Sequence, residues 1–411
     1  MNKYIIYIFL FLFSINNPIK AQDKDIFLSI QLNPNENEYW WNENNNYGVS
    51  LEGFSLVGSI DISRGKMSYY ARFFGNHDFE KIYLNEAFIK IHLKKNSFIK
   101  IGNYYKDFSS YFNDELSSGH MIISNNAKPM PKIGFISNVK FGKFPKLNFD
   151  YGFAHAQFKK EGYYLEAPML HEKFLYMNIK LKKEAKLSLG LVHEVMWNGA
   201  TPELGKLPSS FKDFLKVVIS ADGPLLDGEP HPNALGSHIG IWDFLYEKNF
   251  GNNQLLKVYY QHYFEDTSSL RFANKTDGLW GVELKNFISN SNILLEYLNT
   301  TNAWLDPPYQ KDHYYWNYQY RLGWAYNQKI IGNPLVKAFK LGEFLHLGAK
   351  GEVFSSDYQI KVLRKINEND KLKYKLSFGR QINDRLSFNI FTMNSNNSSN
   401  YFGISFSTFF D

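Results

Sequence analysis

Residues 147–154 read LNFDYGFA, and this stretch alternates strictly between large apolar and small or polar residues. Successive side chains of a β-strand point to opposite faces, so the alternation predicts a strand with one apolar face and one polar face. The apolar face carries Leu147, Phe149, Tyr151 and Phe153, and the other carries Asn148, Asp150, Gly152 and Ala154. Such a strand needs an apolar environment on one side and tolerates water on the other.

The same alternation recurs along the whole chain, and turn residues separate the runs. It is clear at residues 89–93, 187–191, 371–379, 386–390 and 401–410. Short polar turns lie at 94–97, 251–253 and 382–385, while other connections are long. We count about 18 strands of about ten residues, and short turns with unequal longer loops are typical of a membrane barrel. The sequence therefore predicts an all-β fold, a transmembrane antiparallel β-barrel.

The first residues predict export from the cytoplasm. Lys3 gives a positively charged start, residues 4–15 form a short apolar run, and Ala21 is the small residue before a cleavage site. These are the three parts of a secretory signal peptide. A bilayer-spanning helix needs about 20 apolar residues, so an uncleaved anchor helix is the weaker interpretation. We place the signal peptide at residues 1–21 and the mature chain at 22–411.

The composition also favours a barrel. The chain has no cysteine, which excludes disulfide scaffolds, cysteine-ligated zinc and a lipidated cysteine anchor. After residue 21 no apolar run is long enough for a transmembrane helix. Aromatic residues make up 18% of the chain although its mean hydropathy is -0.38, which fits an apolar outside around a polar inside. A soluble β-sandwich or β-helix would also alternate and stays the alternative fold.

One segment departs from the strand pattern. Apolar residues from Phe211 to Val218 recur at helical spacing, and Ser209 and Ser210 before them can cap a helix N-terminus. We predict a short amphipathic helix over residues 209–219. No linker rich in Gly, Ser or Pro divides the chain, so residues 22–411 are predicted to form one barrel domain.

The common catalytic motifs are incomplete in this sequence. Residues 223–228 have the glycine spacing of a phosphate loop but lack the lysine that must follow. His171-Glu172 and His193-Glu194 lack the second histidine of a zinc-protease helix, and residues 403–407 lack the last glycine of a nucleophile elbow. We therefore predict no catalytic residues and no metal site. A serine–histidine pair on the barrel wall, as in outer-membrane phospholipases, stays open because nothing in the sequence selects one.

Aromatic and acidic residues gather where strands end. Aromatic faces can stack on sugar rings while carboxylates accept hydroxyl hydrogens, so the combination favours a glycan site. The candidates are Trp197, Glu265, Asp266, Arg271, Asp277, Trp280, Tyr314, Tyr315 and Trp316. The structural alternative is the aromatic girdle that membrane barrels carry at both interfaces. For any single Trp or Tyr the girdle is the favoured interpretation.

The order of several segments resembles one family. Residues 116–133 (LSSGHMIISNNAKPMPKI) resemble the S-x-N-A-x-P-x-P segment of Wzi-type capsule assembly proteins. Further similar segments follow in the family's order at 170–173, 197–199, 235–238, 242–244, 260–266, 277–281, 314–317 and 323–324. This chain has Asn198 where family members often have a second glycine. The resemblance spans residues 116–334.

The resemblance implies both a fold and a role. The fold is a barrel of about 18 antiparallel strands with a small helical element at the periplasmic side, for which 209–219 is a candidate. The role is that of an outer-membrane lectin that anchors capsular or extracellular polysaccharide at the cell surface, with no catalysis and no cofactor. The formal charge of +6 suits an acidic polysaccharide, which Arg72 and Arg271 would attract.

These inferences define a location, partners and a rival function. We expect a monomeric barrel in the bacterial outer membrane, in contact with lipid and polysaccharide and with no nucleic acid. The main alternative is a porin or substrate-specific channel, which would share the signal peptide, the alternation and the polar lumen. The two functions differ in whether the lumen is open or plugged, which the sequence does not show.

Overall fold

The computed structural model describes residues 23–33, 39–76, 81–94, 96–140, 142, 144–224, 232–288, 290–303, 313–366, 371–394 and 399–410. The predicted signal peptide, residues 1–21, lies outside these ranges. No helix in the described ranges is long and apolar enough to cross a membrane.

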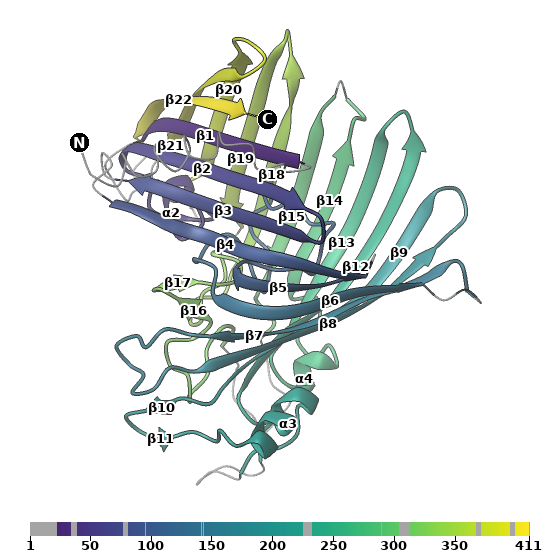
Figure 1. Ribbon diagram of the computed structural model, residues 1–411, viewed down its shortest axis with the longest axis vertical. Helices are drawn as coiled ribbons and strands as arrows, with labels where there is room; N and C mark the ends of the chain where they lie inside the picture. The colour runs from purple at the N-terminus through teal and green to yellow at the C-terminus, as the bar shows by residue number, and fades with distance from the viewer. Residues whose placement is uncertain are drawn as a thin grey trace.

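The described residues form one closed barrel of 18 antiparallel strands, which confirms the predicted fold (Figure 1). The strands are β1 (Asp23–Asn33), β2 (Gly53–Arg64), β3 (Met67–Asn76), β4 (Lys81–Lys94), β5 (Ser97–Asn103), β6 (Pro131–Lys140), β7 (Leu147–Gln157), β8 (Met169–Lys180), β9 (Ala185–Trp197), β12 (Ser237–Gly251), β13 (Gln254–Phe264), β14 (Gly278–Lys285), β15 (Asn292–Asn299), β18 (Glu343–Val353), β19 (Ser356–Lys365), β20 (Lys373–Gln381), β21 (Leu386–Asn394) and β22 (Asn400–Phe410). Neighbours in the chain pair, and β22 pairs back onto β1 with Phe406 opposite Ile30. The closure leaves the sheet without an edge, which overturns the β-sandwich and β-helix alternatives.

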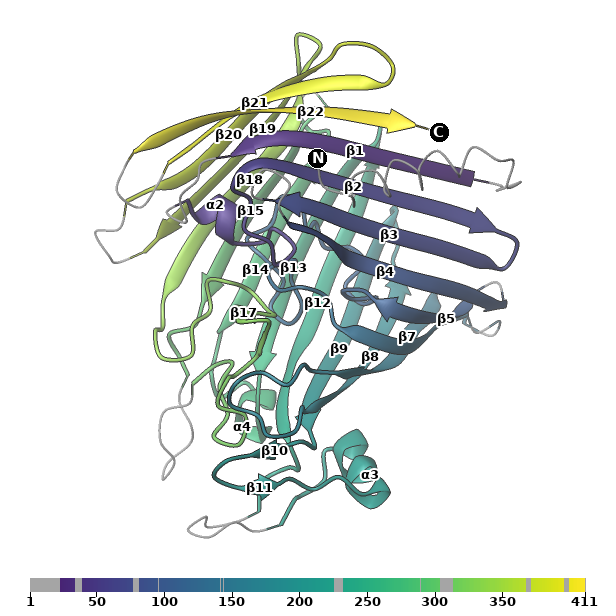
Figure 2. The ribbon, with the colours of Figure 1, turned by 60° about the vertical axis from the view of Figure 1, so that its left-hand side comes forward.

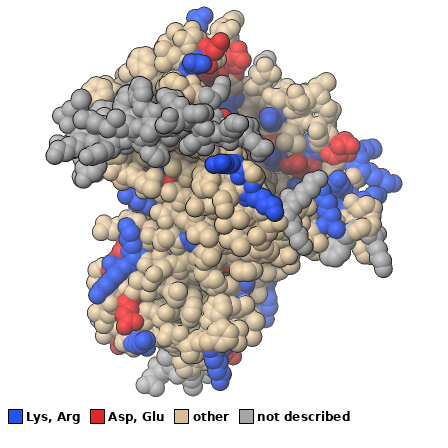
Figure 3. All heavy atoms as spheres, viewed as in Figure 1, with Lys and Arg blue, Asp and Glu red and all other residues tan. Residues whose placement is uncertain are grey.

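The two faces of each strand differ as the alternation predicts. Outward-facing Phe153, Leu175 and Phe406 are about half exposed (49%, 50% and 47%). Inward-facing Ala154 and Phe174 are buried against the contents of the lumen. Figure 3 shows one side of the molecule, where uncharged surface dominates the middle of the described part and charged residues gather nearer the edges. We call the outward-facing apolar side chains the apolar belt, because lipid requires such a surface.

The two ends of the barrel differ in the length of the connections between their strands. One end carries the tight hairpins β2–β3, β8–β9, β12–β13 and β18–β19, the start of β1 and the end of β22 (Figure 2). We call it the short-turn end. The opposite, long-loop end carries the connections 104–130, 198–236 and 300–342. In outer-membrane barrels the short turns face the periplasm, so the long-loop end corresponds to the outer side.

The helices are short and sit at the long-loop end (Figure 1). They are α2 (Trp40–Glu43), α3 (Phe211–Ile219) and α4 (Thr267–Leu270), and two small hairpins join β10 (Ala200–Thr201) to β11 (Gly205–Lys206) and β16 (Ala325–Tyr326) to β17 (Lys329–Ile330). The predicted helix at 209–219 is confirmed as α3. The Ser210 hydroxyl accepts from the Asp213 N–H at 3.2 Å, and the Asp213 carboxylate accepts from the Ser210 N–H at 2.9 Å.

The position of α3 bears on one expectation. The resemblance implied a helical element at the periplasmic side. The connection that contains α3 leaves β9 at Trp197, the end of that strand farthest from the tight β8–β9 turn. In the structure α3 therefore lies at the long-loop end, which the turn-length rule assigns to the outer side. The side of the membrane that carries the helical element stays a prediction.

Candidate functional site

The connection between β5 and β6 folds into the lumen and fills it. Residues 104–130 form no strand or helix. Leu116, Met121 and Ile122 of this segment are fully buried, in one core with inward-facing side chains of the wall such as Leu294. We call residues 104–130 the plug. It contains most of the 116–133 segment that carries the family resemblance.

A buried carboxylate on β12 holds the first part of the plug. Asp243 is fully buried and accepts hydrogen bonds from the Ser109 hydroxyl and the Tyr176 phenol, each at 2.6 Å. It also accepts from the phenol of Tyr111. Hydrogen bonds to a charged acceptor are about twice as strong as neutral ones, so Asp243 ties two plug residues to β8 and β12.

A second buried carboxylate holds the middle of the plug. Glu296 on β15 accepts from the Ser117 hydroxyl at 2.6 Å and from the Ser118 N–H at 2.7 Å. The Tyr259 phenol on β13 donates to the same carboxylate at 2.5 Å. A buried carboxylate is costly unless donors satisfy it, so wall and plug depend on each other here.

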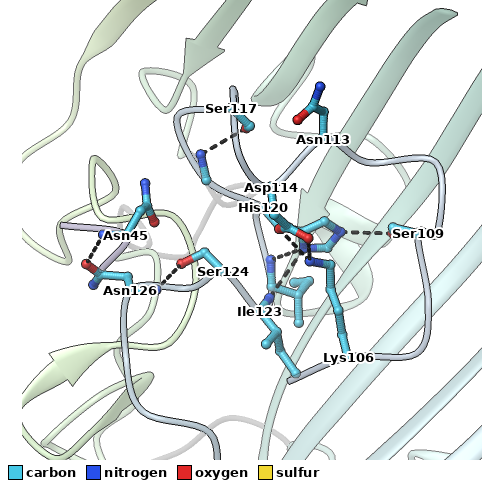
Figure 4. A network of polar contacts seen from close by, with 12 residues as sticks. Asn45, Lys106, Ser109, Asn113, Asp114, Ser117, His120, Ile123, Ser124 and Asn126 are labelled. Atoms are coloured by element: carbon cyan, nitrogen blue, oxygen red, sulfur yellow. Dashed lines mark hydrogen bonds and ion pairs between the residues drawn. The ribbon is translucent and has the colours of Figure 1, made fainter. Parts of the chain in front are cut away.

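His120 organises the plug internally (Figure 4). Its Nδ1 accepts from the backbone N–H groups of Ile122 and Ile123 at 3.1 and 3.3 Å. The ring proton therefore sits on Nε2, which lies 2.9 Å from the Ser109 hydroxyl and donates to it. Ser109 in turn donates to Asp243.

This arrangement bears on the phospholipase alternative. A catalytic histidine must accept a proton from its serine. Here the contacts run the other way, because His120 donates to Ser109 and Ser109 donates to a carboxylate. His120 and Ser109 are also buried, at 0% and 4% exposure, which keeps substrate away. We therefore assign this pair of residues a structural role.

The connection after β15 closes over the plug from the long-loop end. The Trp324 indole N–H donates to the Ile122 carbonyl at 2.7 Å, and the Ser124 hydroxyl donates to the Gly332 carbonyl at 2.7 Å. The phenol of Tyr315 donates to the Met121 carbonyl. Tyr315 has a φ of +61°, a left-handed conformation that bulky residues rarely adopt, so these contacts must hold it there.

Four of the candidates predicted from the sequence meet at this closure. Glu265 accepts from the Tyr315 N–H at 2.7 Å and from the phenol of Tyr263. Asp277 is fully buried and accepts from the Tyr314 phenol at 2.7 Å. The structure thus brings these four residues together, while their predicted role in glycan binding stays a prediction. Their polar atoms are occupied by other protein groups, however, so they form a latch for the loop.

Asp277 is the centre of that latch. Besides Tyr314, it accepts from the backbone N–H of Asn302 at 2.9 Å and from the Asn302 side-chain amide at 2.8 Å. Burial raises the pKa of the Asp277 carboxyl above its usual value. We call Glu265, Asp277, Tyr314 and Tyr315 the latch.

Replacing Asp277 by alanine is expected to loosen the latch. Each buried donor left without its acceptor costs about 1–3 kcal/mol, so peptides covering 313–320 should exchange their amide hydrogens at least tenfold faster than in the native chain. Hydrogen exchange followed by mass spectrometry measures this. Asp266→Ala is the matched control, because Asp266 only caps α4; unchanged exchange at 313–320 in Asp277→Ala would contradict the latch.

Two further candidates belong to α4. Asp266 caps this helix by accepting from the Ser269 N–H at 2.8 Å and the Ser269 hydroxyl at 2.6 Å. The Nε of Arg271 donates to the Thr267 carbonyl at 3.2 Å. Both side chains are exposed at the long-loop end, so they contribute charge to that surface.

The two predicted tryptophans of the strands lie on the outer wall. Trp280 stacks on Tyr260 with ring centroids 3.7 Å apart and is 38% exposed, as expected of a girdle residue. Trp197 is buried under Phe214 of α3, with centroids 5.4 Å apart. Neither faces the lumen. Side chains along a strand point alternately into and out of the barrel, and the sequence at a strand end does not show which residues point inward.

Arg72 lies inside the barrel and is already neutralised. Its guanidinium is 2.9 Å from the Glu86 carboxylate and 4.3 Å from the centre of the Tyr47 ring. An acidic polysaccharide would have to displace Glu86 to reach it. Its predicted attraction for such a polymer therefore has no support in this geometry.

Trp316 is the candidate best placed for a ligand. It is partly exposed beside Phe339, which is 69% exposed, with ring centroids 5.6 Å apart. His313 lies against both rings, and Lys337 and Lys340 are exposed on the turn that carries Phe339. We call these five residues the aromatic–lysine patch. Of these five residues only Trp316 was predicted from the sequence, although a lysine pair around an isolated Phe is a recognisable signal.

A cavity of about 390 Å³ remains between the plug and strands β13–β15. Its lining includes Asn113, Lys257, Glu283 and Lys285. Glu283 is bridged to Lys257 at 3.0 Å and accepts from the Asn113 amide at 2.7 Å. Lys285 precedes the turn at 286–291, so the cavity belongs to the short-turn half of the lumen. Among the described residues, no group of three or more His, Asp or Glu side chains is arranged to hold a metal ion.

The fold and its contents define a class: an outer-membrane β-barrel whose lumen is filled by its own chain. The family model for the capsule assembly protein Wzi matches residues 28–398. The chain therefore belongs to the Wzi capsule assembly family, as the sequence resemblance indicated.

A solved structure at low sequence identity has the same fold. Wzi of Escherichia coli, described as an outer-membrane protein involved in group 1 capsule assembly and a carbohydrate-binding β-barrel, matches with a TM-score of 0.65 at 14% identity, over 97% of this chain and 87% of that one. A Rhodopseudomonas blastica porin mutant matches with a TM-score of 0.40 at 10% identity, over 94% and 98% of the two chains. No curated protein matches this chain.

Proposed function

We propose that this protein anchors capsular or extracellular polysaccharide at the cell surface by binding it on the long-loop end of the barrel. The observation that carries the proposal is the plug. Because the plug fills the lumen, the side chains that a ligand can contact lie on the surface of the long-loop end. The proposal agrees with family membership in capsule assembly and with the carbohydrate-binding character of the Escherichia coli protein.

The aromatic–lysine patch supplies the contacts that such a ligand needs. Trp316 and Phe339 offer partly exposed ring faces for sugar stacking. Lys337 and Lys340 add two cations that suit an acidic polysaccharide, and their attraction weakens with salt because they are exposed. Each contact is weak, but a repeating polymer engages many barrels at once, which raises the overall avidity.

A second group of exposed polar residues lies on the same end. Arg321 is 3.0 Å from Glu203, which also accepts from the Tyr163 phenol at 2.8 Å. The hydrogen bond from Tyr163 lowers the pKa of the Glu203 carboxyl, which therefore stays ionised. These three residues come from three separate loops and widen the surface available to a polymer.

Deleting the gene should release polysaccharide without stopping its synthesis. We expect the cell-bound fraction to fall severalfold while the total amount, cell-bound plus shed into the medium, stays constant. Both quantities can be measured by a uronic acid or total-sugar assay on washed cells and on culture supernatant. Complementation with the native gene is the control, and an unchanged cell-bound fraction in the deletion strain would reject surface anchoring.

A further inference from the structure

The outer wall near α3 breaks the rule that lipid-facing positions are apolar. Inward-facing Glu172 and Phe174 alternate with His171 and Lys173 on β8, so the latter two point outward. The same outer face carries His155 on β7, opposite His171, and His193 on β9, opposite Lys173. His238 on β12 completes the group, which we call the histidine–lysine stripe. Such residues on the outside of a membrane barrel are destabilised by lipid.

Helix α3 covers the part of this stripe that lies on β7 and β8. The Phe214 ring packs on the rings of His155 and His171, with centroids 5.1 and 5.8 Å apart. The ammonium of Lys173 donates to the carbonyl of Val218 near the helix C-terminus. His193 and His238 stack on each other with centroids 5.0 Å apart. One face of α3 is thus docked on the barrel.

The other face of α3 is apolar and uncovered. Phe211, Leu215 and Ile219 are spaced four residues apart, so they form one stripe along the helix. They are 75%, 49% and 74% exposed to solvent in the described structure. Lys212 and Lys216 flank this apolar stripe. A helix with a charged flank and a broad apolar face is typical of segments that lie in a membrane interface.

We propose that α3 is seated in the membrane leaflet at the long-loop end, where it shields His155, His171 and Lys173 and contacts acyl chains through Phe211, Leu215 and Ile219. Two observations select lipid as the occupant. The apolar belt continues directly beneath the helix, because exposed Phe153 lies opposite Lys173 in the β7–β8 register. Lys212 and Lys216 match the anionic headgroups of such a leaflet. The inference does not depend on polysaccharide binding.

The absence of cysteine allows a direct test. Phe211→Cys and Ile219→Cys, each in the full mature chain, are labelled with an environment-sensitive nitrobenzoxadiazole dye. The proteins are placed in lipid nanodiscs of phosphatidylethanolamine and phosphatidylglycerol. Quenching by doxyl-labelled lipid and by aqueous iodide is then compared. The changed positions are exposed, and heat-modifiable gel mobility checks folding.

Two further positions calibrate the measurement. Phe406→Cys lies in the apolar belt, and Glu203→Cys lies on an exposed loop. We expect labels at 211 and 219 to behave like the one at 406, with quenching by doxyl lipid at least threefold stronger than at 203 and protection from iodide. Iodide quenching as strong as at 203 would overturn the proposal. Protection from both quenchers together with thiol-specific cross-linking between copies would overturn it in favour of a second chain as the occupant.

Discussion

Replacing Glu296 by alanine is expected to unlock the plug and let ions pass through a barrel that is otherwise closed. Glu296 receives the Ser117 hydroxyl, the Ser118 N–H and the Tyr259 phenol, all within the buried interior. Each buried donor that loses its acceptor costs about 1–3 kcal/mol, so the plug–wall contact should lose several kcal/mol. This is the largest single effect we expect in the molecule.

Planar-bilayer recordings measure the expected opening. The native chain should show little or no ion conductance, while Glu296→Ala should show frequent opening events. Glu352→Ala is the matched control, because Glu352 is an exposed carboxylate on the neighbouring strand β18. If the alanine variant fails to fold, Glu296→Gln keeps one acceptor oxygen and should open more rarely. A folded Glu296→Ala barrel as silent as the native one would show that Glu296 does not hold the plug.

Replacing Trp316 by alanine should weaken polysaccharide binding about tenfold, which corresponds to about 1.4 kcal/mol and is typical of an aromatic anchor in an interface. Trp316 is positioned by the latch at Tyr314 and Tyr315 and presents its ring beside Phe339. Its removal should therefore cost ligand contact area without disturbing the barrel. Binding can be measured by titrating the purified protein with polysaccharide from the same cells.

Trp280→Ala provides a control with the same change in side chain. Trp280 lies on the outer wall and stacks on Tyr260. Its replacement by alanine is expected to leave polysaccharide affinity unchanged and to lower barrel stability slightly. The two variants separate a ligand-facing tryptophan from a lipid-facing one. Equal loss of affinity in both would mean that the aromatic–lysine patch is not the binding surface.

The plug bears on the two leading functions that the sequence leaves open. A porin and an anchoring lectin share the alternating strands and a polar lumen. Here the core around Leu116, Met121 and Ile122 fills the lumen, and Asp243 and Glu296 hold it in place. The structure therefore gives no support to an open channel as the resting state.

The sequence by itself determined the barrel, because its strands are encoded locally by period-2 alternation and its turns by short polar stretches. The helix at 211–219 was also predictable, since Ser210 and Asp213 form a local capping box. The resemblance carried by residues 116–133 identified the family, although the segment showed nothing of its place inside the lumen.

Only the tertiary structure decided what the candidate residues do. In the sequence Asp277 looks like a solvent-exposed carboxylate at a strand end. In the structure, contacts with Asn302 and Tyr314, which are distant in the chain, bury it in the latch. Trp280 and Trp316 look alike in sequence, but one faces outward from the wall and the other sits on a folded loop. Loop paths and inward-pointing carboxylates are set by contacts between residues far apart in the chain, and local periodicity carries no information about those contacts.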